Sequence, residues 1–267
     1  MGLFGLPRRN RKNKMGTIYQ KKSFTEDGQK KLFLDRYEKE AIDYDQNRYT
    51  THPYWIFFNK VQTRCFEKIL NAKKSERILD VGCGTGRITE FLLKKGYLVS
   101  GVEPAQNMVE VCKEKLNCFN PLIKKGDIEN IPFKDNSFDK VYTMHVLFHL
   151  PKSVIKAGIA EMYRVVKPEG KIYLDFSNKN GIWTQLSLLL NPRRKTKRGE
   201  RHQMFTITEI RQLFKGYNYK LEGIFSYART LYNASLLRPV MYFLEQHVPI
   251  PVKWRSQIIV VVKKCSH

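Results

Sequence analysis

The sequence predicts an α/β fold in which a doubly wound, mostly parallel sheet carries helices on both faces. Short apolar segments alternate with segments of helical periodicity as far as residue 178. The stretch ILDVGCGTGR (78–87) follows an apolar run and precedes a helical one. A strand, a glycine loop and a helix N-terminus in this order are typical of a nucleotide-type site at the carboxyl edge of an open sheet.

The N-terminal part is predicted to hold a basic arm and two helices. Residues 1–31 contain nine Lys or Arg against Glu26 and Asp27, and we expect them to be disordered. Helical periodicity begins near Leu32 and carries Tyr37, Ala41 and Tyr44. Residues 54–71 form a second amphipathic pattern whose apolar side is suited to cover a sheet.

The spacing around the glycine loop indicates which ligand it binds. The dinucleotide pattern G-x-G-x-x-G requires a third glycine at the position of Arg87, and the Gly-Lys-Ser/Thr ending of a phosphate loop is missing. Asp80 lies two residues before Gly82, where a carboxylate suits an amino group better than a pyrophosphate. Glu103 ends the next apolar run and can accept two hydrogen bonds from a ribose diol.

Four segments resemble, in the expected order, the class I S-adenosylmethionine-dependent methyltransferases that act on small molecules and lipids. They are ILDVGCGTGRIT (78–89), VSGVEPAQNM (99–108), KKGDIENIPFKDNSFDKVYTMHVLFHL (124–150) and VVKPEGKIYLDFSN (165–178). The resemblance covers roughly residues 35–267. It implies S-adenosyl-L-methionine as cofactor and a Rossmann-like, seven-stranded sheet with an antiparallel C-terminal strand pair.

The resemblance also implies roles for individual residues. Asp80, Gly82 and Gly84 would line the methionine moiety, Glu103 would bind the ribose, and Asp127 with Ile128 would flank the adenine. The remaining cofactor-binding candidates are Cys83, Met144 and Tyr44, which is expected either to cover the methionine end or to belong to the core. Cys83 is interpreted as a small side chain beside the ligand rather than as a nucleophile.

A general base is needed only when the acceptor is a hydroxyl or an acidic carbon. His145 follows the fourth predicted strand and is the candidate for that catalytic role. His149 is interpreted as a packing residue, and His202 lies in a basic loop and is a poorer candidate.

The C-terminal part departs from strict alternation. Thr206 and Glu209 form a capping box that predicts a short helix up to Phe214. Strands are predicted at 217–229 and 256–264. Two apolar insertions, at about 179–205 and 230–252, are expected either to form a substrate cap or to extend the core or a dimer contact. Residues 32–267 then make up one methyltransferase domain.

Charge and cysteine usage limit the partners. The formal charge is +23, and the segment PRRKTKRGER (192–201) adds a second basic cluster to the N-terminal one. Such clusters attract anionic membranes or nucleic acid, or they are solvated tails. The five cysteines show no metal-ligand spacing, so no metal is expected. No membrane span or secretory signal is evident, and we expect a cytoplasmic protein, peripheral to a membrane if the clusters bind lipid.

The sequence therefore predicts transfer of a methyl group to an O, N or C atom of a small-molecule or lipid-like acceptor. One alternative is an RNA methyltransferase that uses the basic arm. However, the Asn/Asp-Pro-Pro-aromatic motif of base-amino methyltransferases is replaced by Thr143-Met144-His145-Val146, and no Pro-Cys pair occurs. The other alternative is a catalytically silent cofactor-binding scaffold.

Overall fold

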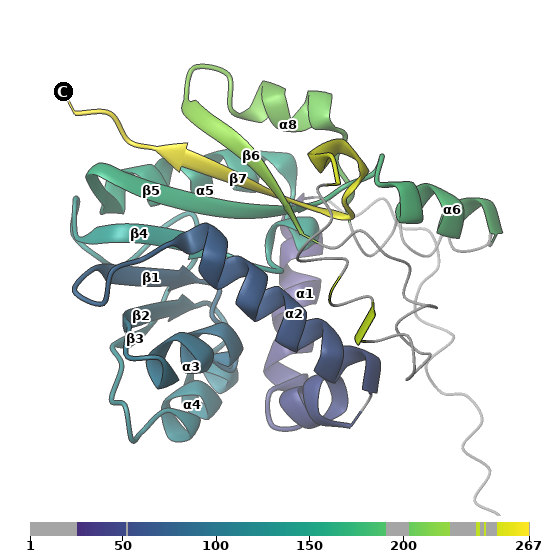
Figure 1. Cartoon of the computed structure of the whole chain (residues 1–267). Coiled ribbons are helices and arrows are strands. Elements are labelled where there is room, and N and C mark those ends of the chain that lie inside the picture. The colour runs from purple at the N-terminus through teal and green to yellow at the C-terminus, as the bar shows by residue number, and fades with distance from the viewer. Residues whose placement is uncertain are drawn as a thin grey trace, which may run out of the picture.

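The computed structural model describes residues 26–51, 53–190, 203–224, 239–240, 243 and 250–266. It contains a seven-stranded sheet in the order β3-β2-β1-β4-β5-β7-β6, with helices on both faces (Figure 1). The strands are β1 (Arg77–Val81), β2 (Leu98–Glu103), β3 (Ile123–Lys125), β4 (Phe138–Thr143), β5 (Val166–Ser177), β6 (Asn218–Ile224) and β7 (Gln257–Lys263).

The first five strands run parallel, and β7 pairs antiparallel with both β5 and β6. This arrangement confirms the predicted fold class, including the antiparallel C-terminal pair. β7 is buried along six of its seven residues because it lies between two other strands. A strand covered on both faces needs a continuous apolar run, and Ile258 to Val262 provides one.

Two helices cover one face of the sheet, and two others cover the opposite face. Helices α2 (Pro53–Leu70) and α3 (Arg87–Lys94) pack on β1, β4 and β5 through a cluster that includes Phe66, Leu92 and Tyr142. Helices α5 (Lys152–Val165) and α8 (Ile207–Leu213) cover the other face through Ile159 and Ile210, among others. Figure 1 shows α2 in front of the sheet and α5 behind it.

The remaining described elements lie at the ends and edges of the sheet. They are α1 (Glu26–Glu40), the π-helical turn η1 (Gln46–Thr50), α4 (Gln106–Lys115), the 3-10 turns η2 (Leu147–His149) and η4 (Val252–Trp254), and α6 (Ile182–Leu190). The capping box of Thr206 and Glu209 is formed at the start of α8, as predicted.

The N-terminal boundary differs from the sequence prediction. Helix α1 begins at Glu26 instead of near Leu32, so residues 26–31 are helical and do not form part of a disordered arm. The helix also ends at Glu40 and does not continue to Tyr44, which follows a turn. The rest of the arm and the basic segment 192–201 lie outside the described residues, as do His202 and most of the 230–252 insertion. The division into an arm and a domain therefore stays a prediction.

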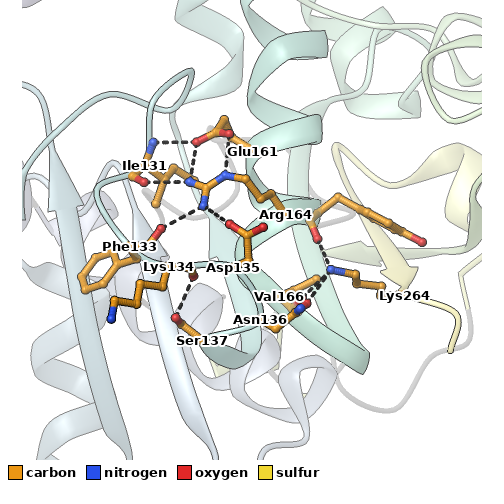
Figure 2. A network of polar contacts seen from close by, with 11 residues as sticks. Ile131, Phe133, Lys134, Asp135, Asn136, Ser137, Glu161, Arg164, Val166 and Lys264 are labelled. Atoms are coloured by element: carbon orange, nitrogen blue, oxygen red, sulfur yellow. Dashed lines mark hydrogen bonds and ion pairs between the residues drawn. The ribbon is translucent and has the colours of Figure 1, made fainter. Parts of the chain in front are cut away.

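The loop that leads from β3 towards β4 is fixed by Arg164 of α5 (Figure 2). Its guanidinium donates to the carbonyl oxygens of Ile131 and Phe133, each at 2.9 Å, and pairs with Glu161 and Asp135. Five donors in one planar group allow this many contacts at once. The network holds the segment directly after Asp127 and Ile128, which face the pocket described below.

Two kinds of feature are absent from the described residues. No helix among them has the length and apolar character needed to cross a bilayer. Within the same ranges, no three His, Cys, Asp or Glu side chains group closely enough to hold a metal ion.

Candidate cofactor and active site

One pocket lies at the carboxyl ends of β1, β2 and β4, beneath α1. It encloses about 1100 Å³, including the part open to solvent. All ten residues predicted from the sequence line it: Tyr44, Asp80, Gly82, Cys83, Gly84, Glu103, Asp127, Ile128, Met144 and His145.

The glycine loop brings the backbone close to this pocket. Gly82 has φ +77° and Gly84 has φ +56°, a region that other residues rarely adopt. The amides of Gly82 and Cys83 both donate to the carbonyl of Val102, which ties the loop to β2. A Cβ added to Gly84 would meet no atom within 4 Å, so this glycine borders open space that a ligand can fill.

Asp80 is a buried carboxylate at the end of β1. Thr89 Oγ1 and Tyr142 Oη each donate to its Oδ2 atom at 2.7 Å. Burial raises the pKa of Asp80 to about 6, although both hydrogen bonds oppose the shift. Because both bonds reach Oδ2, Oδ1 is the atom with which Asp80 can accept a hydrogen bond from a cationic ligand group.

Glu103 ends β2 and is 6% exposed. Its carboxylate accepts hydrogen bonds from the amides of Gly84 (2.9 Å) and Ala105 (3.1 Å), so the side chain is held in one position. Burial raises the pKa of Glu103 to about 7, against the effect of the two amides. A carboxylate fixed in this way beside a loop can accept hydrogen bonds from a neighbouring diol.

Asp127 faces the same pocket from the segment after β3 and pairs with Lys30 of α1. The Lys30 Nζ lies 2.8 Å from Asp127 Oδ2 and also contacts Glu129. Ile128 beside it is buried against Gly158 of α5. An acid next to a flat apolar wall is suited to hold an aromatic base with an exocyclic amino group.

Cys83 contributes its backbone to the pocket while its side chain packs elsewhere. The thiol lies in a small apolar cluster with Val109 and Cys112 of α4 and with Leu116, the residue that follows this helix. Its hydrogen bond with Cys112, together with burial, raises the pKa of Cys83 well above its ordinary value. A thiol kept protonated is a poor nucleophile, which favours the small-side-chain interpretation.

Tyr44 lies above the pocket in an aromatic group. Its ring is 5.9 Å from that of Tyr37 and 6.1 Å from that of Tyr49, both edge-on. Tyr37 Oη lies 2.8 Å from Nε2 of His149, and His149 itself lines the pocket. The histidine interpreted as packing is thus buried, as expected, but at the pocket wall.

His145 lies just beyond β4 in an unusual conformation. Its φ is +64°, and its amide donates to Oδ1 of Asp175 at 2.9 Å. The ring lies edge-on to Phe58 and Phe148, and Nε2 contacts Nε2 of Gln62. Non-glycine residues held at positive φ cluster at functional sites, where the surrounding structure compensates the strain.

Sequence reasoning missed several residues of the pocket and its surroundings. Lys30, Tyr37 and Arg87 line it, and Gln62 and Asp175 contact His145. Asp45, next to Tyr44, accepts a hydrogen bond from Thr85 Oγ1 at 2.6 Å and pairs with Lys115.

Comparison with known proteins shows similarity to methyltransferases over the central part of the chain. Residues 79–174 match the model of a family described as "Methyltransferase domain". This match, together with the methyltransferase relatives and structures below, supports the resemblance to the class I S-adenosylmethionine-dependent methyltransferases. S-adenosyl-L-methionine is the methyl donor of this family.

Curated relatives are similar over part of their length. An uncharacterized methyltransferase from Schizosaccharomyces pombe is 41% identical over 112 residues, which cover 38% of this chain and 39% of the relative. A demethylmenaquinone methyltransferase from Staphylococcus epidermidis is 35% identical over 119 residues, or 43% of this chain and 48% of the relative. The chain thus matches less than half the length of these two proteins.

A solved structure supports the same fold. Magnesium protoporphyrin IX methyltransferase from Synechocystis, solved with bound S-adenosylhomocysteine, superimposes with a TM-score of 0.64 at 17% identity, covering 88% of this chain and 99% of that one. The same protein was also solved with bound S-adenosylmethionine. At this level of identity the likeness shows a shared fold.

Proposed function

We propose that the protein transfers the methyl group of S-adenosylmethionine to an O, N or C atom of a small-molecule or lipid-like acceptor. The observation that carries this proposal is the set of three carboxylates, Asp80, Glu103 and Asp127, that face one pocket beside the open backbone of Gly84. A dinucleotide would place its pyrophosphate near Asp80 and be repelled. A cofactor with an amino group, a ribose diol and an adenine gives each acid a donor.

The cofactor-binding roles follow from these positions. Oδ1 of Asp80 would accept from the amino group of the methionine moiety, and Glu103 would accept from the ribose hydroxyls. Asp127 would accept from the adenine amino group after Lys30 moves away from it. The other predicted residues would shape the pocket around the cofactor. Gly82, Cys83, Gly84 and Met144 would line the methionine side, Ile128 would line the adenine side, and Tyr44 would cover the site.

The methyl-transfer step requires few catalytic groups from the protein. The sulfonium of the bound cofactor supplies an activated methyl group, so the protein has to align the acceptor and keep water out. The aromatic group around Tyr44 closes one side of the pocket. His145 is placed at the pocket wall, where it would take a proton from an acceptor hydroxyl or acidic carbon during transfer.

Calorimetric titration with S-adenosylmethionine tests the cofactor assignment. Saturable binding is expected for the wild type, with at least tenfold weaker binding in Glu103→Ala. Glu114→Ala, which removes an exposed acid from α4, is the matched control and should bind like the wild type. Equal affinity in all three proteins would contradict the assignment of Glu103. Binding without product across a wide panel of acceptors would favour the silent scaffold.

The names of similar proteins support a small-molecule acceptor. One relative is named for demethylmenaquinone, and one structural neighbour is named for magnesium protoporphyrin IX. Product formation with quinols, porphyrins and lipid-like phenols, followed by mass spectrometry, is the direct test. A gain of 14 mass units per transferred methyl group would identify the acceptor class.

We further propose that the protein contacts anionic membranes at α6. Ile182, Leu186 and Leu189 are exposed and, by helical spacing, share one side of this helix. The basic sequence 192–201 follows directly. Co-sedimentation with phosphatidylserine vesicles at low salt is expected, and Leu189→Glu should weaken it. If RNA is bound instead, with steep salt dependence and no vesicle binding, the nucleic-acid alternative is favoured.

A further inference from the structure

A buried chain of polar side chains runs behind His145 and is not used by the proposed cofactor site. It joins Arg87 of α3, Gln62 of α2, Gln257 of β7 and Asp175 of β5. Gln62 is 0% exposed and Asp175 is 1% exposed. Hydrogen bonds buried this deeply need a donor facing an acceptor at every contact, because an unsatisfied buried group is costly.

The two ends of the chain fix the direction of every bond within it. Arg87 has only donors, so the Gln62 atom that it contacts at 2.9 Å must be the carbonyl Oε1. The amide nitrogen of Gln62 then faces Nε2 of His145 and Oε1 of Gln257, the latter at 3.3 Å. At the other end, the Gln257 amide nitrogen donates to Oδ2 of Asp175.

The chain closes into a ring at His145. Asp175 receives the Gln257 side chain on Oδ2 and the His145 backbone amide on Oδ1. The backbone of His145 at positive φ and its imidazole are therefore held by one connected set of groups. Reversing the Gln62 amide would set donors against the Arg87 guanidinium and leave two carbonyl oxygens facing each other at Gln257.

We propose that Gln62 is a positioning residue that holds His145 as the neutral tautomer protonated on Nδ1. Because the Gln62 amide donates, Nε2 must accept and cannot carry a hydrogen. The inference rests on the proposed function, since it concerns the histidine assigned to the acceptor side.

In this arrangement Nε2 of His145 is unprotonated and can act as a base, but the Gln62 amide covers it. The one lone pair available for a proton is on Nε2, and the Gln62 amide occupies it. An acceptor hydroxyl that gives its proton to His145 must therefore displace that amide, and the new Nε2–H then needs an acceptor in place of a donor. Gln62 would thus set the tautomer in the resting enzyme and protect Nε2 from water until an acceptor arrives.

Nitrogen-15 NMR of the histidine ring nitrogens tests the proposal without any acceptor. The His145 signals, assigned by their loss in His145→Gln, should show a protonated Nδ1 and an unprotonated Nε2 at pH 8. In Gln62→Glu the new carboxylate keeps the contact with Arg87 but can only accept, so Nε2 should become protonated. Asn59→Ala, which removes the other Arg87 partner, should leave the wild-type pattern unchanged.

Gln62→Leu is a second variant in case Gln62→Glu does not fold, as judged by circular dichroism. Without the Gln62 amide, Nε2 of His145 is no longer required to accept a hydrogen bond, and the Nε2-protonated form should become populated. A wild-type His145 already protonated on Nε2, or a pattern that neither variant changes, would overturn the proposal. If the wild-type protein does not bind S-adenosylmethionine, the proposed function is refuted instead. The two failures can be told apart because the tautomer is measured in the free protein, without cofactor.

Discussion

Gly82 and Gly84 of the loop allow the cost of backbone strain to be measured separately from the loss of space for a ligand. An alanine at either Gly82 or Gly84 would have to adopt a left-handed conformation, which costs about 1–2 kcal/mol. At Gly84 the added methyl group meets nothing within 4 Å, whereas at Gly82 it would lie 2.5 Å from Cγ2 of Val146. The overpacking at Gly82 adds about 1–3 kcal/mol.

Urea unfolding followed by circular dichroism measures this difference. Gly84→Ala should lower the free energy of unfolding by about 1–2 kcal/mol, the strain alone. Gly82→Ala should lower it by about 2–5 kcal/mol, the sum of strain and overpacking. The cost of Gly82→Ala should decrease in a Val146→Ala background, since that substitution removes the atom in contact, and the double-mutant cycle isolates this part.

Gly84→Ala, the substitution with the smaller effect on stability, should have the larger effect on cofactor affinity. The Gly84→Ala methyl group enters the space beside the loop, so the Kd for S-adenosylmethionine should rise at least tenfold, about 1.4 kcal/mol. Two results would refute the reasoning: equal destabilisation by the two glycine substitutions, or an unchanged Kd in a folded Gly84→Ala protein.

Three further predictions follow from the buried acids and the loop thiol. The pKa of Asp80 is about 6 in the free protein, and a cationic amino group favours its charged form, so S-adenosylmethionine affinity should rise with pH through 6 and then level off. Titrations that show no pH dependence and no proton release near pH 6 would contradict this. The pKa values of Glu103 and Asp175 are raised by burial to about 7, so the folded protein binds protons more tightly than the unfolded chain between about pH 4 and 7. The stability of the wild type relative to Glu103→Gln or Asp175→Asn should therefore fall as pH rises across that interval in chemical unfolding, and a rise would disprove the assignment. Cys83→Ala should retain methyl transfer and cofactor binding within about threefold because its thiol packs away from the pocket, and complete inactivation of the folded variant would restore the nucleophile interpretation.

The parts of the fold that could be predicted are those whose signal is local. The apolar runs of most strands, the glycine loop and the capping box at Thr206 are each contained in about ten residues and were located from the sequence, whereas the three-residue strand β3 was not. The start of α1 was missed because residues 26–31 are polar and carry no apolar period. Lys30 in that turn contacts Asp127 and Glu129, about a hundred positions away in the chain. Only the folded chain brings such a pair together.

The same distinction applies to the candidate site. Asp80 and Glu103 were predicted because each stands at or near the end of an apolar run beside the glycine loop, and Asp127 because its segment resembles that of the methyltransferase family. The polar chain behind His145 could not be predicted, since Gln62, Arg87 and Gln257 lie in separate elements. Each of these residues alone resembles an ordinary helix or strand position, and their shared role depends on bond directions that no sequence period records.

The position of α1 has a consequence for the timing of each catalytic cycle. Its residues Lys30, Phe33 and Tyr37 form part of the pocket wall, so a movement of this helix would widen the path by which a reacted cofactor leaves. The ion pair of Lys30 with Asp127 is about one-third exposed and hence weakened by salt. Product residence time, more than the transfer step, would then respond to ionic strength. In a cell, the turnover rate of such an enzyme would be set by the exchange of the reacted cofactor for new methyl donor.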